Sequence, residues 1–143
     1  MKRTIKFRGQ SVKNCHSINS DKPLCKIGQW LYGDLDTLST PSPRIRFKDK
    51  NGDIISMEVN PETIGQFTGL HDKDGNEIYE GDILSFRING KIVKNQVGWI
   101  DSIAAFDFVK SKTPSFFNEL YAKKSIIIGN IHDSPELLKG DKQ

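Results

Sequence analysis

The sequence has few alanines, few cysteines and no long hydrophobic run. Its 3 Ala stand beside 17 Ile, 5 Val and 13 aromatic residues, so side chains that favour strands far outnumber the best helix former. The longest apolar runs, residues 103–106 and 126–128, are far shorter than the roughly 20 residues that cross a bilayer. The basic N-terminus is not followed by the apolar stretch of a signal peptide. We therefore expect a mainly β, cytoplasmic protein without a membrane partner.

The two cysteines, Cys15 and Cys25, lie in a polar stretch near the N-terminus. A reducing compartment keeps such residues as thiols, so we expect no structural disulfide. Together with His16 they offer at most three metal ligands, whereas a structural zinc site needs four ligands at short paired spacings. The sequence therefore predicts no metal site here.

Three turn signals divide the chain into hairpins, because Asn or Asp before Gly favours a tight turn with positive φ. These signals are Asn51-Gly52, Asp74-Gly75 and Asn89-Gly90. The first predicts a half-buried hairpin of residues 44–48 and 54–59, with Ile45 and Phe47 on one face and basic residues on the other.

The other two signals predict hairpins in the second half of the chain. Asp74-Gly75 lies in a longer turn between residues 67–70 and 77–79. Around Asn89-Gly90, residues 83–88 are expected to pair with residues 91–97. This register places Phe86 opposite Val93 and Arg87 opposite Ile92, with mixed faces as in a small curved barrel.

Helical signals are short. Two sites place a capping residue before proline and an acid, as a helix start requires: Asn60-Pro61-Glu62 and Ser134-Pro135-Glu136. Residues 113–124 contain Pro114 and the spacing Phe116, Phe117, Leu120, which predicts a short amphipathic helix. The polar stretches 15–26 and 36–43 predict loops.

Charge is distributed unevenly along the chain. Residues 1–60 carry 11 Lys and Arg against 6 Asp and Glu, whereas residues 61–143 carry 10 against 12, so the two parts have net charges of +5 and −2. We predict a small N-terminal β unit over residues 1–60 and a second β-rich region over residues 61–143. The two regions can also form one compact structure.

Several segments together resemble the YopX family of phage and prophage proteins. They are Ile5-Lys6-Phe7-Arg8, Trp30-Leu31-Tyr32-Gly33, residues 61–70, residues 72–83, Ile128-Gly129-Asn130-Ile131 and Pro135-Glu136-Leu137-Leu138. The resemblance covers nearly the whole chain and implies an SH3-like barrel in residues 61–143. It implies a mobile-element origin but no activity. The chain departs from the family pattern at His71 and His132, where Lys and Tyr are common, so neither looks like a functional residue of the family.

One turn imitates the start of a calcium-binding EF-hand loop, with Asp72, Asp74 and Asn76 at alternating positions. The sixth position would be Glu77 instead of Gly, and the twelfth would be Ile83 instead of Glu. We therefore interpret these residues as a hairpin turn in which Asp and Asn bond to nearby backbone.

No catalytic constellation is complete. His71-Asp72 and His132-Asp133 are sequence neighbours, which rarely face each other in a strand or turn. Gly90-Lys91 lacks the first Gly and the Ser or Thr of a phosphate-binding loop. The carboxylates of Glu77, Glu80 and Asp82 flank a strand entry, where Asp commonly accepts backbone bonds. We predict no catalytic residue, no cofactor and no enzyme activity.

Basic residues alternate along two predicted strands. If these strands are neighbours, six cations share one surface that can contact nucleic-acid phosphates. The six are Lys2, Lys6, Arg8, Arg44, Arg46 and Lys48. Trp30, Tyr32 and Trp99 are candidate stacking platforms, although aromatic residues in a β protein more often pack in the core. The alternative interpretation is a solvated sheet face that charge protects from aggregation.

The sequence thus leaves two functions open. The favoured one is a non-enzymatic interaction module that forms a homo-oligomer or binds a phage or host protein, because small β units must cover or pair their sheet edges. The alternative is a weak nucleic-acid-binding protein that uses the basic N-terminal sheet.

Overall fold

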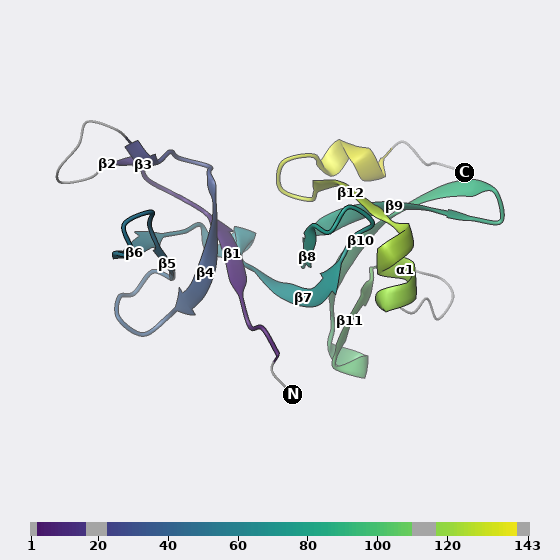
Figure 1. The fold of residues 1–143 in the computed structure, drawn as a ribbon, viewed down its shortest axis with the longest axis horizontal. Helices are drawn as coiled ribbons and strands as arrows, with labels where there is room; N and C mark the ends of the chain where they lie inside the picture. Colours follow the sequence, from purple (N-terminus) through teal and green to yellow (C-terminus); the bar gives the residue numbers. More distant parts are fainter. Residues whose placement is uncertain (1–2, 17–22, 110–116, 140–143) are drawn as a thin grey trace. The chain divides into compact units, whose positions relative to one another are not determined.

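The structure of the protein is a computed structural model that describes residues 3–16, 23–109 and 117–139. The chain divides into two compact units, Lys2–Gln66 and Phe67–Gln143. Strands predominate in both, as the composition predicts (Figure 1). The first unit contains β1 (Phe7–Gln10), β2 (Cys15–His16), β3 (Pro23–Cys25), β4 (Trp30–Asp36), β5 (Arg44–Lys48), β6 (Ile54–Glu58) and the 3₁₀ helix η1 (Pro61–Thr63).

The second unit contains most of β7 and every later element. These are β7 (Gly65–His71), β8 (Glu77–Tyr79), β9 (Asp82–Ile88), β10 (Lys91–Ile100), η2 (Asp101–Ile103), β11 (Ala105–Phe108), α1 (Glu119–Lys124), β12 (Ile126–Asn130) and η3 (Pro135–Leu138). Strand β7 starts in the first unit, where it pairs with β1, and continues into the second, where it pairs with β8.

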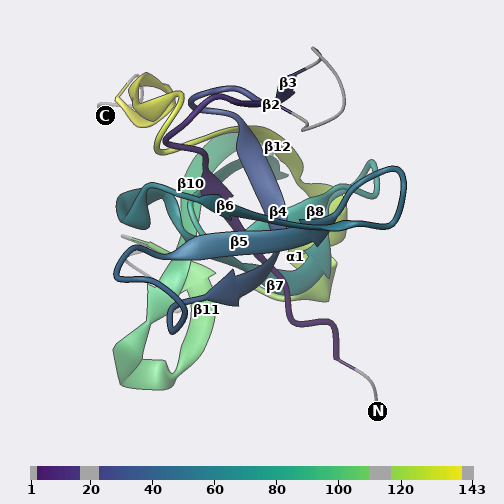
Figure 2. The same ribbon diagram turned by 90° about the vertical axis from the view of Figure 1, so that its left-hand side faces the viewer.

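The N-terminal unit is an antiparallel sheet in the order β6-β5-β4-β1, followed by the first residues of β7. The predicted hairpin of β5 and β6 is confirmed, and the two strands lie side by side in Figure 2. Alternate residues of these strands face a small aliphatic core. That core consists of Cys25, Leu31, Ile45 and Val59, with Phe7, Leu35, Phe47, Met57 and Ile64 packed against it. The charged residues of β5 therefore point to the other face.

The loop prediction for residues 15–26 is wrong in part. Strands β2 and β3 form a two-stranded ribbon in which the backbone of Cys15 lies opposite that of Cys25. Cys25 is a buried free thiol whose Sγ lies 3.6 Å from Ser11 Oγ. A polar composition concealed this ribbon because bonds between residues far apart in the chain flank it, such as those that the Ile27 N–H donates to Asn14 Oδ1 and the Gly28 N–H donates to the Ser11 carbonyl.

The boundary between the units falls six residues after the predicted one. Asn60 donates its backbone N–H to the Gln10 carbonyl at 2.8 Å, and Gln10 donates to Thr63 Oγ1 at 2.9 Å. Gly65 and Gln66 then pair with β1. These bonds tie residues 60–66 to the N-terminal sheet, and they join positions too distant in sequence to be recognised from local composition.

The C-terminal unit contains a four-stranded antiparallel sheet in the order β11-β10-β9-β12. The predicted register of β9 and β10 is confirmed, with Phe86 opposite Val93 and Arg87 opposite Ile92. Asn89 has φ 51° and Gly90 has φ 79°, as a two-residue turn with two positive φ angles requires.

Aromatic side chains dominate the core of this unit. The rings of Phe86 and Phe108 stack with centroids 5.2 Å apart, and Phe117 meets Phe108 edge-on at 5.4 Å. Ile78, Leu84, Val97 and Ala122 complete the buried cluster. The buried residues of this core come from the strands β8 to β11 and from α1.

The helical segments are short, as predicted. Asn60 caps η1, and its Oδ1 accepts a bond from the Glu62 backbone N–H at 3.1 Å. The predicted helix over residues 113–124 begins only at Glu119, because Asn118 acts as its N-cap. Pro114 and Phe116 lie outside the described residues. No helix in the described part of the chain is long and apolar enough to cross a membrane.

The mainly β fold class is confirmed, but the expected SH3-like barrel is not closed among the described strands. Strand β8 has three residues and pairs with β7, whereas β9 to β12 form a separate sheet. The backbone N–H of Tyr79 in β8 donates to the Asp82 carboxylate at 2.7 Å.

Candidate functional site

The six predicted nucleic-acid contacts do not lie on neighbouring strands. Strand β4 separates β1 from β5, so the condition for one continuous cationic surface is not met. Lys2 lies outside the described residues, and Lys6 is half-buried. Arg8 is only 5% exposed, with its guanidinium 4.5 Å from the centroid of the Trp30 ring. A cation held against an aromatic ring in this way is engaged in packing.

The basic residues of β5 face acids of β4. The register places Asp36 opposite Arg44 and Asp34 opposite Arg46. Arg44 also donates from Nε to Ser56 Oγ at 2.8 Å and from Nη2 to the Ser56 carbonyl at 2.7 Å.

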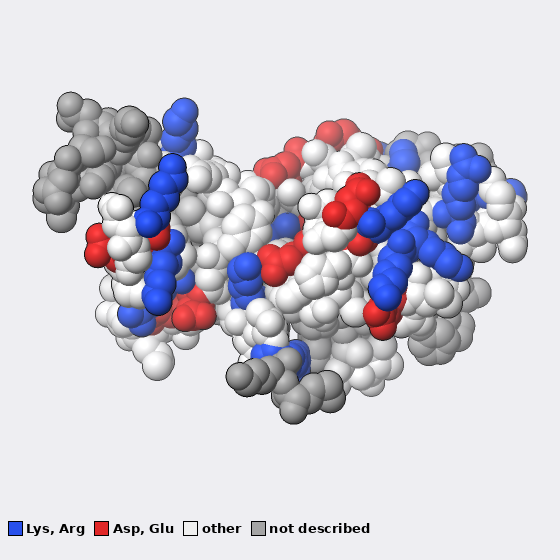
Figure 3. Space-filling model, viewed as in Figure 1, with Lys and Arg blue, Asp and Glu red and all other residues white. Residues whose placement is uncertain are grey.

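Asp36 remains charged across the physiological pH range. A hydrogen bond from the Ser39 hydroxyl and bonds from the backbone N–H groups of Leu38 and Ser39 lower the pKa of Asp36 to about 2, and Arg46 contributes to the same shift. Of the six, Arg46 and Lys48 are the exposed cations on β5. Figure 3 shows blue and red atoms side by side on this unit. The face is mixed in charge, and nucleic-acid binding by it stays a prediction.

The EF-hand-like segment is a hairpin turn, as predicted. The Asp72 carboxylate accepts bonds at 2.9 Å from the backbone N–H groups of Asp74 and Asn76, and at 3.2 Å from that of Ile127. Burial opposes ionisation of Asp72, but these bonds and one from the Asn76 side chain outweigh it and lower its pKa. His71 is not among the donors, so the candidate pair of His71 and Asp72 is not formed.

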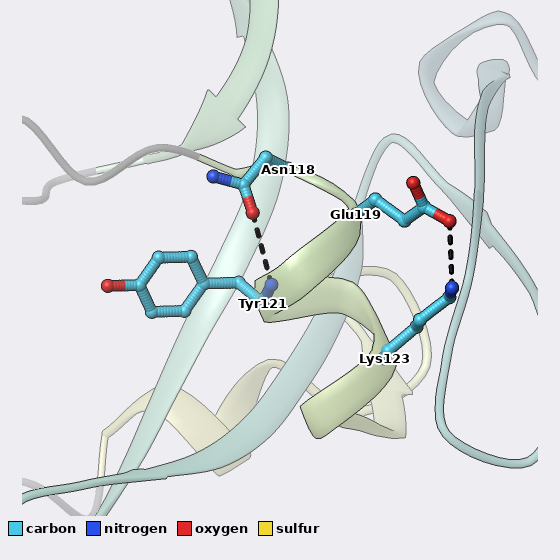
Figure 4. A network of polar contacts seen from close by, with 4 residues as sticks. All are labelled: Asn118, Glu119, Tyr121 and Lys123. Atoms are coloured by element: carbon cyan, nitrogen blue, oxygen red, sulfur yellow. Dashed lines mark hydrogen bonds and ion pairs between the residues drawn. The ribbon is translucent and has the colours of Figure 1, made fainter.

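A pocket of about 500 Å³ lies beside this turn, between the end of β7 and α1. Its charged lining residues include Lys73, Glu119 and Lys123. In Figure 4, Asn118 caps the helix through a 3.1 Å bond to the Tyr121 N–H, and Glu119 pairs with Lys123 at 2.8 Å. Both partners of that ion pair are 69% exposed, so the pair contributes little to stability.

The other candidate catalytic and phosphate-binding motifs have structural roles. Asp82 accepts the Tyr79 N–H, and Glu77 accepts the Tyr79 hydroxyl at 3.1 Å, which confirms their interpretation as strand-entry residues. Gly90 and Lys91 lie at the β9–β10 turn rather than in a phosphate-binding loop. Among the described residues, no group of three or more His, Cys, Asp or Glu side chains is arranged to hold a metal ion.

The second hairpin of the C-terminal sheet is formed by β10 and β11, and we call it the aromatic hairpin. It carries an exposed apolar cluster of Trp99, Ile103 and Phe106. The Trp99 and Phe106 rings meet edge-on with centroids 5.2 Å apart. Trp99 is 47% exposed and Ile103 is 56% exposed. Val97 and Phe108 share the same strand face but are buried, so the apolar face of the hairpin extends beyond its own core.

Sequence reasoning named Trp99 but missed the cluster. The available signal was the apolar run of residues 103–106, which lies directly across the turn from Trp99. Its exposure depends on where the core ends, and local sequence does not contain that information.

Comparison with known proteins identifies the family. The chain matches the family model described as "YopX protein" over residues 6–139. The chain belongs to the YopX family. The YopX match spans both units and includes residues 61–83, which form η1, β7, β8 and the Asp72 turn.

The fold of this YopX chain is similar to that of a solved structure. It is the crystal structure of protein EF1440 from Enterococcus faecalis, which is 23% identical, with 96% of this chain and 99% of that chain covered and a TM-score of 0.53. This likeness concerns the fold alone. A search among curated proteins found no match.

Side chains cap the edge strands of this YopX fold. On β6, Arg44 donates to the Ser56 carbonyl. On β11, the Asp107 carboxylate accepts the Phe108 N–H at 2.7 Å and the Phe117 N–H at 3.0 Å. On β12, Asp72 accepts the Ile127 N–H. The bonds to the backbone of Ser56, Phe108 and Ile127 use strand groups that would otherwise be available to a strand of another molecule.

Proposed function

We propose that the protein is a cytoplasmic, non-enzymatic interaction module that associates with a second copy of itself through the aromatic hairpin. The observation that carries this proposal is the exposure of Trp99 and Ile103 on the hairpin of β10 and β11. Large aromatic side chains held in place by a sheet bury much apolar area at little entropic cost, and they are enriched at protein interfaces.

The capped edges favour a side-chain interface over strand addition. Asp72, Asp107 and Arg44 each bond a backbone group at a sheet edge. An added strand would have to displace these charged groups from their bonds. A symmetric dimer instead places one apolar patch against the same patch of the partner, where no like charges need to meet at the centre.

Two other functions have less support. The pocket beside the Asp72 turn contains lysines and an exposed ion pair but no nucleophile with an adjacent base. The basic face of the N-terminal sheet is the alternative nucleic-acid surface, but Asp34 and Asp36 stand opposite its two arginines. Acids in these positions repel a polyanion.

Light scattering over a range of micromolar concentrations tests the proposal. The wild-type chain is expected to exceed the mass of a monomer, and Ile103→Ser is expected to shift it towards a monomer. Ile54→Ser is the matched control, because Ile54 and Ile103 are both 56% exposed but only Ile103 belongs to the aromatic hairpin.

A monomeric wild-type chain across the whole range would refute self-association. An equal loss of mass in both variants would show that general surface hydrophobicity, and not the aromatic hairpin, drives it. Circular dichroism of each variant confirms that the fold is retained.

A further inference from the structure

The hairpin of β9 and β10 extends away from the rest of its unit as a two-stranded arm, residues 85–94 (Figure 1). At its tip, Ile88 lies opposite Lys91 across the tight turn, and Arg87 lies opposite Ile92. Every residue from 87 to 92 is exposed. The arm thus presents side chains on both faces while its backbone is held by ladder bonds.

The charge of this arm has one sign. Arg87, Lys91 and Lys94 are its three cations, and no Asp or Glu occurs between residues 83 and 100. Within the described part of the chain, none of these three side chains has an ion-pair partner. Figure 3 shows blue atoms and no red ones over the projecting end of the hairpin. The N-terminal sheet, with its interleaved acids, lacks this property.

Apolar side chains accompany the cations. Ile92 is 60% exposed and shares a face with Arg87 and Lys94, whereas Ile88 is 40% exposed on the opposite face near Lys91. A two-stranded ribbon is narrow enough to enter the major groove of duplex DNA, where cations contact phosphates and apolar groups contact thymine methyls. The arm offers both kinds of group on a preformed ribbon.

We propose that the β9–β10 arm binds duplex DNA, with Arg87, Lys91 and Lys94 on phosphates and Ile92 against the groove. This contact is independent of the proposed self-association, which uses a different hairpin. Most of its affinity comes from the release of counterions, so binding is weak, insensitive to sequence and strongly dependent on salt.

Fluorescence anisotropy with a labelled 20-base-pair duplex at 50 to 200 mM salt tests this proposal. Three neutralised phosphates predict a slope of log affinity against log salt of about −2.7, because each contributes about −0.9. The triple variant R87E/K91E/K94E is expected to lose at least about tenfold in affinity, since it removes those contacts. Ile92→Ser is expected to weaken binding without changing the slope.

The matched control is R46E/K48E/K50E on the N-terminal unit. All three of these cations are exposed. Each reversal changes the charge by −2, so either triple variant takes the net charge from +3 to −3. The two variants therefore differ in where the charge is reversed and not in its total. The control is expected to retain affinity within about threefold.

The proposal would be overturned by no binding of the wild-type chain at 50 mM salt, by an equal loss in both triple variants, or by equal affinity for poly-glutamate of matching charge. The last would assign the arm to an acidic protein partner. The neutral variant R87Q/K91Q/K94Q, whose fold is checked by circular dichroism, distinguishes a loss of DNA contacts from unfolding caused by the charge reversals. If it is folded and binds DNA like the wild-type chain, the arm is not the contact.

Discussion

The N-terminal sheet and the β9–β10 arm differ in how their charges are arranged. The first 60 residues have a net charge of +5, yet β4 places Asp34 and Asp36 opposite the arginines of β5. Residues 61–143 have a net charge of −2, yet they contain the acid-free arm. The net charge of a segment is therefore a poor guide to a polyanion site, because strand pairing decides which charges become neighbours.

The two cores differ as well. The N-terminal core is aliphatic and centres on Leu31, Ile45 and Val59, whereas the C-terminal core is built around the stacked rings of Phe86 and Phe108. Large aromatic residues bury more area per side chain. We therefore expect the C-terminal unit to be more sensitive to the loss of one core side chain.

Truncation of a core residue in each unit should produce the largest effects. We expect Phe108→Ala to cost about 3–5 kcal/mol of unfolding free energy, because it removes contacts with Phe86 and Phe117 and leaves a cavity. Ile45→Ala, at a site with 0% exposure, should cost about 2–5 kcal/mol. Chemical denaturation measures both. A larger cost for Ile45→Ala would contradict the ranking of the two cores.

Glycine substitutions compare the close packing of the two sheets. A Cβ at Gly33 in β4 would overlap the backbone carbonyl oxygen of Arg46, whereas one at Gly98 in β10 would meet the Val109 side chain at 2.6 Å. A side chain can shift more easily than a paired strand. Thermal unfolding should show that Gly33→Ala costs about 1–3 kcal/mol or more, and that Gly98→Ala costs less. Equal melting temperatures for the two variants would contradict this.

Two acidic residues with lowered pKa values, Asp72 and Asp36, should affect stability at low pH differently. Asp72 is buried and accepts backbone bonds, so its stabilisation is present above the unfolded-state pKa of about 3.9 and is lost as pH falls through the lower folded-state value. Asp72→Asn should cost about 1–3 kcal/mol at pH 7, where the charged acceptor is lost.

The same variant should flatten the pH dependence of stability below about pH 4, the range in which Asp72 titrates. Asp36 has a pKa of about 2 but lies at the end of β4 and is less buried than Asp72, so Asp36→Asn should change stability less. Urea denaturation at pH 7 and pH 3 measures both variants. An acid sensitivity that Asp72→Asn leaves unchanged would contradict the assignment.

The smallest effects concern α1. Asn118→Ala removes the bond that the Tyr121 N–H donates to Asn118 Oδ1 and should cost about 1 kcal/mol, the usual contribution of an N-cap. Lys123→Ala breaks the exposed ion pair with Glu119 and should leave the melting temperature unchanged. The pair of variants separates a cap from a surface contact. A larger loss for Lys123→Ala than for Asn118→Ala would reverse this interpretation.

Much of the local structure could be predicted from the sequence. The Asn89-Gly90 turn and the alternation on either side of it predict the register of β9 and β10. Asp72 and Gly75 mark the next turn upstream, and Asn60 before Pro61 marks a capped helical turn. These predictions succeeded because each depends on a bond or dihedral angle within a few residues.

The candidate sites were predicted less well. Six basic residues were assigned to one surface, but β4 lies between the two strands and Arg8 is buried beside Trp30. The arm was identified as a hairpin but not as a binding surface. Its character as a surface depends on how far this hairpin projects beyond the core of its unit.

The sequence by itself determined the turns, the caps and the faces of the individual strands, because these follow from side-chain bonding and two-residue alternation over short distances. Only the tertiary structure decided the strand order, the capping of sheet edges by Asp72, Asp107 and Arg44, and the exposure of Trp99 and Ile103. Those features depend on contacts between residues far apart in the chain. The bond from Ile127 to Asp72 spans 55 positions, and no local pattern specifies it.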